Sequence, residues 1–296
     1  MNTVLKKIIK GHVGPIYNAC YDGAHFLYTT AADKYVTRWN IETGEQDGFS
    51  VKLPEAAFHI GLIQNNGKLL IGTNSGNIHI IDLETKVEIK CIEFHKASIF
   101  SSVEMKTQAL ILVGDADGNI SIWNSVSFEL LMTIPLNAGK IRCFALNDSE
   151  KLLVVGSQDG KIRVLETSFF NELKVFDAHK GGVNDLKYSS INNNWLFSAG
   201  KDGLLILWDL EKDKILKSIP AHYETIYALG LLNQFLVSGS RDKSIKIWDQ
   251  ELVPLQKIDH KIKGHTRSVN GVGVINSTTF YSYSDDATLR IWSVEM

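Results

Sequence analysis

The feature that most constrains the fold of this chain is one sequence slot that recurs seven times at nearly constant spacing. Five of the six tryptophans occupy this slot, and an isoleucine and a leucine fill it in the two remaining repeats. The slot stands at positions 39, 81, 123, 165, 208, 248 and 292, so that successive repeats lie 40 to 44 residues apart. An aspartate stands six residues before each of the five tryptophans: Asp33, Asp117, Asp202, Asp242 and Asp286. A period near 42 residues predicts a chain of similar structural units.

Each repeat consists of four short strand-like runs separated by turn residues. In the sixth repeat the runs cover residues 225–232, 234–239, 244–249 and 254–258. Aspartate-glycine pairs, which favour tight turns, precede the third run in three of the repeats. No long stretch shows the 3.6-residue apolar period of a helix. The pattern predicts an all-β fold, a seven-bladed β-propeller of four-stranded antiparallel blades.

The two ends of the chain are expected to complete each other. The last repeat has only four residues after its tryptophan, so its fourth strand is missing. Residues 4–9 at the other end form a strand-like run without a partner in their own repeat. Pairing this run with the last blade would remove two open sheet edges. We therefore predict a single domain over residues 1–296, in which residues 1–10 supply the closing outer strand and residues 11–296 the seven repeats.

Composition excludes several classes of function. The net charge of −2 gives no electrostatic reason to expect nucleic acid or an anionic membrane as a partner. The chain has no apolar run of about 18 residues and no recognisable secretory signal, and we expect a cytoplasmic monomer. The cysteines Cys20, Cys91 and Cys143 lie far apart in apolar contexts, which favours reduced thiols. Because no HExxH, CxxC, GxGxxG or P-loop motif is present, we expect no metal and no cofactor.

Two dipeptides accompany the repeats and suggest a family. Gly-His stands at 11–12 and 264–265 and becomes Ala-His or Phe-His in other repeats, while Trp-Asp stands at 208–209 and 248–249. With these motifs in register over essentially the whole chain, the sequence resembles the WD40-repeat family. The resemblance implies a seven-bladed propeller that is latched by its N-terminal strand.

The resemblance also implies a buried network of His, Ser or Thr, Asp and Trp within a blade. Four blades supply all four residues: His12, Thr29, Asp33 and Trp39 in the first; His179, Ser198, Asp202 and Trp208 in the fifth; His222, Ser238, Asp242 and Trp248 in the sixth; His265, Ser282, Asp286 and Trp292 in the seventh. The third blade is expected to be partial, with His95, Asp117 and Trp123 but Val113 in the hydroxyl slot. The fourth keeps only Asp159, and the second keeps none. Four near-identical sets at one spacing are typical of a structural device, not of catalytic triads.

Partners of such propellers are expected on the top face, around the central channel. By resemblance, the partner-binding residues are Tyr17, His59, Phe100, Lys140, Arg142, Lys201, Tyr227 and Arg241. Four of these are cations on blades four to six, opposed by one aspartate at an equivalent position, Asp285, whereas blades one to three offer Tyr17, His59 and Phe100 without formal charge. This suits a peptide with an apolar anchor and an acidic or phosphorylated flank. We predict a non-catalytic protein–protein interaction scaffold, with a small-molecule-binding or catalytic channel as the alternative.

Overall fold

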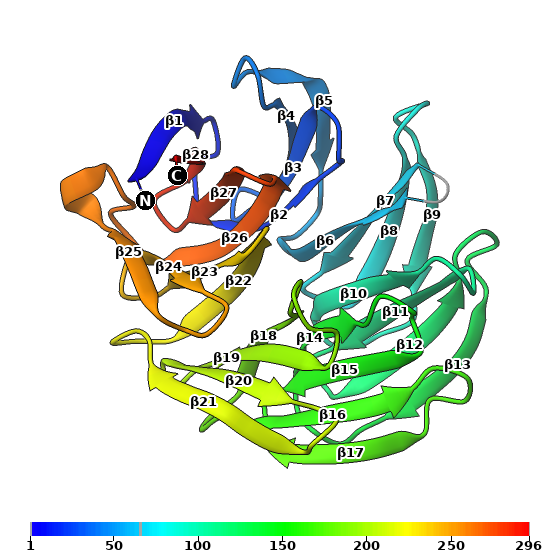
Figure 1. The fold of residues 1–296 in the computed structure, drawn as a ribbon. Helices are drawn as coiled ribbons and strands as arrows, with labels where there is room; N and C mark the ends of the chain where they lie inside the picture. Colours follow the sequence, from blue (N-terminus) through cyan, green and yellow to red (C-terminus); the bar gives the residue numbers. More distant parts are fainter. Residues whose placement is uncertain (1, 65–66, 296) are drawn as a thin grey trace.

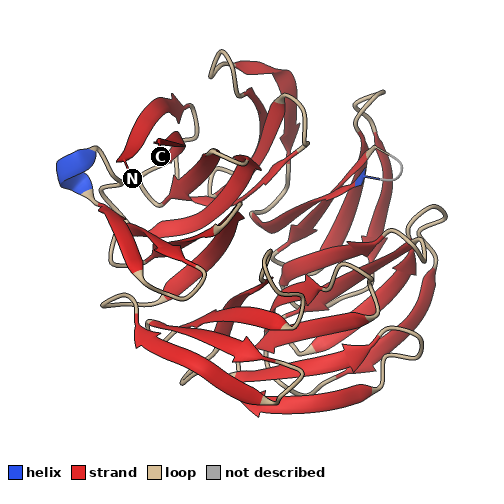
Figure 2. Cartoon of the chain, viewed as in Figure 1, coloured by secondary structure: helices blue, strands red, loops and turns tan. Residues whose placement is uncertain are grey.

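The chain folds as a ring of seven β-sheets. The computed structural model describes residues 2–64 and 67–295, and in these residues 28 strands form seven four-stranded antiparallel sheets. The sheets stand around a common axis like blades, and helix is confined to short turns such as η2 (His260–Ile262) (Figure 1, Figure 2). The prediction of an all-β seven-bladed propeller is therefore confirmed.

Consecutive strands build the first six blades from the channel outward. Blade one has β2 (Ile16–Tyr21), β3 (Phe26–Ala31), β4 (Tyr35–Asn40) and β5 (Gln46–Lys52); blade two has β6 (Ala57–Ile63), β7 (Lys68–Thr73), β8 (Asn77–Asp82) and β9 (Glu88–Glu93). Blade three has β10 (Ile99–Met105), β11 (Leu110–Asp115), β12 (Asn119–Asn124) and β13 (Leu130–Pro135); blade four has β14 (Ile141–Leu146), β15 (Leu152–Ser157), β16 (Lys161–Glu166) and β17 (Glu172–Asp177). Blade five has β18 (Val183–Tyr188), β19 (Trp195–Gly200), β20 (Leu204–Asp209) and β21 (Lys214–Pro220); blade six has β22 (Ile226–Leu232), β23 (Phe235–Ser240), β24 (Ile245–Asp249) and β25 (Pro254–Ile258).

The seventh blade joins the two ends of the chain. It contains β26 (Val269–Asn276), β27 (Thr279–Ser284), β28 (Thr288–Glu295) and, outermost, β1 (Asn2–Lys10). Strand β1 pairs antiparallel with β28 from Asn2 opposite Glu295 to Lys10 opposite Thr288, and both termini lie at this blade (Figure 1). The predicted closure of the ring by the N-terminal strand is confirmed.

Apolar side chains hold neighbouring blades together. The second strand of every blade shows the same burial pattern, with its last five residues buried, because both faces of the sheet pack against another blade. The described residues form seven apolar clusters, and each cluster contains side chains from two adjacent blades. The cluster between blades seven and one contains Trp39, Tyr283 and Ile9 of the closing strand. The ring of packed sheets gives the inner strands fixed positions around the channel.

Candidate functional site

A cavity of about 780 Å³ opens along the axis of the ring, and residues from all seven inner strands line it. The second residue of each inner strand faces this channel. These residues are Tyr17, Phe58, Phe100, Arg142, Asn184, Tyr227 and Asn270. The channel therefore presents one side chain per blade at an equivalent position.

A β-bulge places each of these side chains. In blade one, Ile16 pairs with Ala31 and the next pair joins Asn18 to Thr30, so Tyr17 is an extra residue in its strand. The register of the other six inner strands is interrupted at the same point. A bulge leaves the extra residue outside the ladder and turns its side chain away from the regular alternation. Seven repeated bulges thus account for the ring of channel-facing residues.

Blade two corrects the sequence-based alignment by one residue. Ala57 pairs with Thr73 and the next pair joins His59 to Gly72, so the bulged residue is Phe58 and not His59. The sequence analysis located each channel residue by its distance from the loop histidine. Blade two has no loop histidine, so its channel residue was placed one position too late. The available signal was the buried small or aliphatic residue that comes before each channel residue, here Ala57.

His59 remains on the channel wall but in a different role. Its side chain is buried, and its Nε2 lies 2.7 Å from Ser102 Oγ. Burial lowers the pKa of His59 to about 4, so the ring is neutral near pH 7. His59 therefore adds no positive charge to the channel.

Three aromatic rings form a continuous strip across blades one to three. The rings of Tyr17 and Phe58 meet edge to face with centroids 5.0 Å apart, and those of Phe58 and Phe100 stack at 5.5 Å. Both distances fall in the range of favourable aromatic pairs. Phe58, which the sequence analysis missed, is the ring that joins the other two.

Two cations of blade four extend the aromatic strip. The Cζ atom of Arg142 lies 5.0 Å from the centroid of the Phe100 ring, and the Nζ atom of Lys140 lies 5.1 Å from it. No carboxylate of the described residues lies within 4 Å of either cation. Burial lowers the pKa of the Arg142 guanidinium. An arginine side chain is always charged in practice, so Arg142 is a cation that no carboxylate of the described residues neutralises.

The remaining predicted partner residues divide into two groups. Tyr227 lines the channel. Lys201 and Arg241 are exposed and lie outside the channel lining, and Arg241 Nε is 3.4 Å from Glu224 Oε2. The structure thus brings six of the eight residues to the channel or its aromatic strip and leaves these two on outer loops.

Two tyrosines of blade seven also line the channel, and the sequence analysis did not single them out. Tyr281 and Tyr283 stand opposite Gly273 and Gly271 in the neighbouring strand. A Cβ atom on either glycine would lie about 2 Å from the facing ring, so only glycine leaves room for the rings to cross the strand. Burial raises the pKa of both phenols, which keeps them neutral.

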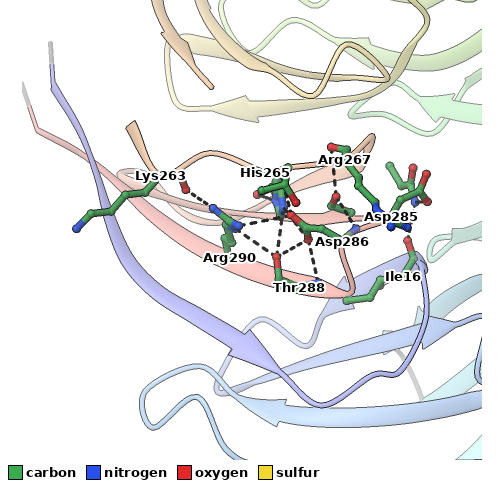
Figure 3. A network of polar contacts seen from close by, with 12 residues as sticks. Ile16, Lys263, His265, Arg267, Asp285, Asp286, Thr288 and Arg290 are labelled. Atoms are coloured by element: carbon green, nitrogen blue, oxygen red, sulfur yellow. Dashed lines mark hydrogen bonds and ion pairs between the residues drawn. The ribbon is translucent and has the colours of Figure 1, made fainter. Parts of the chain in front are cut away.

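The histidine networks lie in the blades rather than in the channel. In blade seven, His265 Nδ1 is 2.9 Å from Asp286 Oδ2 (Figure 3). On the other side of the ring, His265 Nε2 is 2.8 Å from Ser282 Oγ, which accepts the N–H of Trp292 at 2.9 Å. Arg290 extends this network to the carbonyl oxygen of Lys263. The same three contacts, between 2.7 and 3.0 Å, join the expected residues of blades one, five and six.

Each of these networks gives a partner to both ring nitrogens of a neutral imidazole, one as donor and one as acceptor. Trp248 Nε1–H donates to Ser238 Oγ, the serine hydroxyl donates to His222 Nε2, and His222 Nδ1–H donates to Asp242. Burial lowers the pKa of His222 more strongly than Asp242 raises it. Burial alone would raise the pKa of Asp242, but the hydrogen bond from His222 and those from Ser244 lower it well below its ordinary range. The paired groups hold a blade together.

Blade three differs from its expected partial network. His95 Nδ1 lies 2.7 Å from Asp115 Oδ2 and His95 Nε2 lies 2.7 Å from Ser121 Oγ, which accepts the Trp123 N–H at 2.7 Å. The expected Asp117 is exposed instead. The network is complete because the carboxylate comes from the end of β11 and the hydroxyl from β12, which compensates for Val113.

Blades two and four replace the network with other polar pairs. In blade four, Arg163 Nη2 lies 2.6 Å from Asp159 Oδ2 and Arg163 Nε lies 3.4 Å from Glu172 Oε2. In blade two the carboxylate comes from the loop, because Glu55 accepts hydrogen bonds from the backbone N–H and the hydroxyl of Ser75. In both blades the loop carboxylate therefore finds a partner other than a loop histidine.

Comparison with known proteins relates these observations to one family. The model of the family described as "WD domain, G-beta repeat" matches residues 128–165, 170–209, 213–249 and 256–293, which together make up just over half of the chain. No helix among the described residues has the length and apolar character that crossing a membrane requires.

Several curated proteins match parts or most of the chain. The human kinesin-like protein KIF21A is 33% identical over 107 residues, 35% of this chain and 6% of that protein. The mouse kinesin-like protein KIF21B is 24% identical over 317 aligned residues, 96% of this chain and 18% of that protein. GID complex subunit 7 of Schizosaccharomyces pombe is 34% identical over 94 residues, 29% of this chain and 18% of that protein. The chain thus spans less than a fifth of the length of these relatives.

Proposed function

Because the chain belongs to the WD40-repeat family, we propose that it is a non-catalytic scaffold that binds a peptide or protein partner at its central channel. Propellers of this family generally serve as protein-interaction scaffolds. A relative is named as the subunit of a complex, the GID complex. Since a fold alone does not determine function, the proposal depends on the channel side chains.

The aromatic strip with its two cations is the observation that carries the proposal. Tyr17, Phe58 and Phe100 offer rings to an apolar side chain, and Lys140 and Arg142 lie against the last of these rings. Aromatic residues and arginine are the residue types that most often dominate binding energy at protein interfaces. This combination supports a partner segment with an apolar residue next to a negative charge.

The unpaired state of Arg142 supports an acidic or phosphorylated flank. Keeping a partly buried guanidinium without a carboxylate is unfavourable, and a bound carboxylate or phosphate would relieve that cost. A charge-assisted hydrogen bond of this kind contributes about 1.5–3 kcal/mol, or roughly tenfold or more in affinity. Lys201 and Arg241 belong to the proposed surface as outer contacts. They should contribute less to the binding free energy than Arg142, because they are exposed.

The alternative, a small-molecule or catalytic channel, has weaker support. Its two candidate titratable groups are His59, which is buried and neutral, and Asp285, whose Oδ1 accepts a hydrogen bond from Asn270 at 2.7 Å. The two residues belong to blades two and seven, and neither is paired as a nucleophile with a base.

A peptide library in matched phosphorylated and unphosphorylated forms would test the proposal. We expect the wild-type protein to enrich peptides with an apolar residue beside an acidic or phosphorylated one. Arg142→Gln and Phe100→Ala should each weaken the enriched peptides by roughly tenfold or more. Lys214→Gln, which removes the same charge from the outer strand β21, is the matched control and should leave affinity unchanged.

Melting curves would separate loss of binding from loss of folding. Equal peptide affinity of wild type and Arg142→Gln, both folded, would contradict the proposal. Enrichment of cationic peptides instead would contradict the assigned partner chemistry.

A further inference from the structure

Blade two brings together a histidine, a glutamate and a cysteine on its two outer strands. His79 on β8 stands directly opposite Cys91 on β9, and Glu88 begins β9. One nitrogen of the His79 ring, one carboxylate oxygen of Glu88 and the Cys91 sulfur all lie within 4.8 Å of one another. The sequence analysis expected no metal site, because these residues are spread over two strands and form no short motif.

His79 is the fixed member of this group. Its side chain is buried, its Nδ1 lies 2.7 Å from Glu88 Oε1, and its Nε2 is buried without a hydrogen-bond partner among the described residues. A buried nitrogen left unpaired is unfavourable. At the same position blades one and three carry Thr37 and Ser121, whose hydroxyls contact the loop histidine. Blade two has no loop histidine, so no blade network holds the His79 ring, and its Nδ1, the nitrogen beside Glu88, can bind an ion.

We propose that His79, Glu88 and Cys91 bind one Zn²⁺ ion on the outer part of blade two. Imidazole nitrogen, carboxylate oxygen and thiolate sulfur are the three ligand types that zinc combines in proteins. The sulfur ligand disfavours Mg²⁺ and Ca²⁺, which prefer sites made of oxygen alone. Three protein ligands leave the fourth position of a tetrahedral ion to water.

The present separations require only small movements of exposed side chains. With zinc bonds of about 2.0–2.3 Å, two ligand atoms of a tetrahedral site lie roughly 3.3–3.7 Å apart. Glu88 and Cys91 are exposed and can adjust to this spacing around the buried His79. On binding, the Cys91 thiol releases its proton to solvent and the thiolate forms the zinc–sulfur bond.

The experiment uses the full chain, stripped of metal by a chelator and then titrated. Zn²⁺ competing with a chromophoric chelator should bind at one ion per chain. Co²⁺ should produce a thiolate-to-cobalt charge-transfer band together with the intense visible bands of a tetrahedral site. Of the three cysteines Cys91 is the exposed one, whereas Cys143 is buried and Cys20 is half-buried, so the band reports on this site.

Variants identify the ligands. Cys91→Ser should abolish the charge-transfer band, and both Cys91→Ser and Glu88→Gln should weaken Zn²⁺ by roughly tenfold or more, since losing even a partner of a ligand costs 10–100-fold. Glu84→Gln removes an exposed charge from the turn that leads to β9, outside the cluster, and should bind as wild type does. Absence of stoichiometric binding by wild type, or unchanged affinity in folded Cys91→Ser, would overturn the proposal and mark any bound metal as adventitious.

Discussion

Replacing Ser238 by alanine tests how much a blade network contributes to stability. The Ser238 hydroxyl is fully buried, accepts the N–H of Trp248 at 2.9 Å and donates to His222 Nε2 at 2.8 Å. Alanine removes the hydroxyl and leaves both partners in place. A tryptophan donor and an imidazole acceptor then lie buried and unpaired in the middle of blade six.

The expected loss follows from these two orphaned groups. Each unsatisfied buried group costs about 1–3 kcal/mol. Partial relaxation of the blade offsets some of this cost, so we expect the free energy of unfolding to fall by about 2–4 kcal/mol. If Trp248→Phe first removes the indole donor, Ser238→Ala should cost less, because one of the two orphaned groups is already gone.

Urea unfolding followed by circular dichroism gives the free energies for this cycle. The matched control is Ser127→Ala, where an exposed hydroxyl contacts Glu129 at 3.2 Å, and it should change stability by no more than about 0.5 kcal/mol. If the free energy of unfolding of Ser238→Ala lies within about 0.5 kcal/mol of wild type, the reasoning is refuted. It is also refuted if Ser238→Ala lowers this free energy equally in the wild-type and Trp248→Phe backgrounds.

Three further predictions concern the fold. Burial holds the pKa of His222 and His265 below the ordinary 6.5, so the unfolded chain binds protons more readily than the folded one. The stability that depends on these neutral rings is present above pH 6.5 and should fall as the pH is lowered from 7 to 5.5. A urea midpoint that stays constant or rises over this range would contradict this. Deleting residues 1–9 exposes the edge of β28 and removes Ile9 from the core, so the melting temperature should fall. The lost burial of Ile9 alone corresponds to about 1.5–3 kcal/mol of unfolding free energy. An unchanged melting curve would mean that the strand does not close the ring. Asp115→Ala should destabilise the protein by more than about 1 kcal/mol and Asp117→Ala by less than about 0.5 kcal/mol, and the reverse order in denaturation midpoints would contradict the blade-three network.

The sequence predicted the fold because its period and its strand pattern agree. Repeats that carry both a loop histidine and a tryptophan, such as those ending at Trp208 and Trp248, can be aligned at two points. Two fixed points leave no freedom in the register of the strands between them. The closing strand was also predictable, since one end of the chain had a surplus strand and the other lacked one.

The channel and the variant blades were predicted less completely for the same reason. In blade two no histidine fixes the register, and an error of one residue exchanged Phe58 for His59. In blade three the network draws Asp115 and Ser121 from neighbouring positions, which a slot-by-slot comparison does not consider. The ion pair between Arg241 and its neighbouring glutamate depends on loop geometry that no periodicity encodes.

Site-specific photocrosslinking tests channel binding most directly. A photoreactive benzoylphenylalanine would replace Phe100 in the channel or, as a control, Phe169, whose side chain is 78% exposed. We expect crosslinks from position 100 to one partner, mapped by mass spectrometry to a segment with an apolar residue beside an acidic or phosphorylated one, and we expect none from position 169. A partner that crosslinks from position 169 but not from position 100 would contradict binding at the channel.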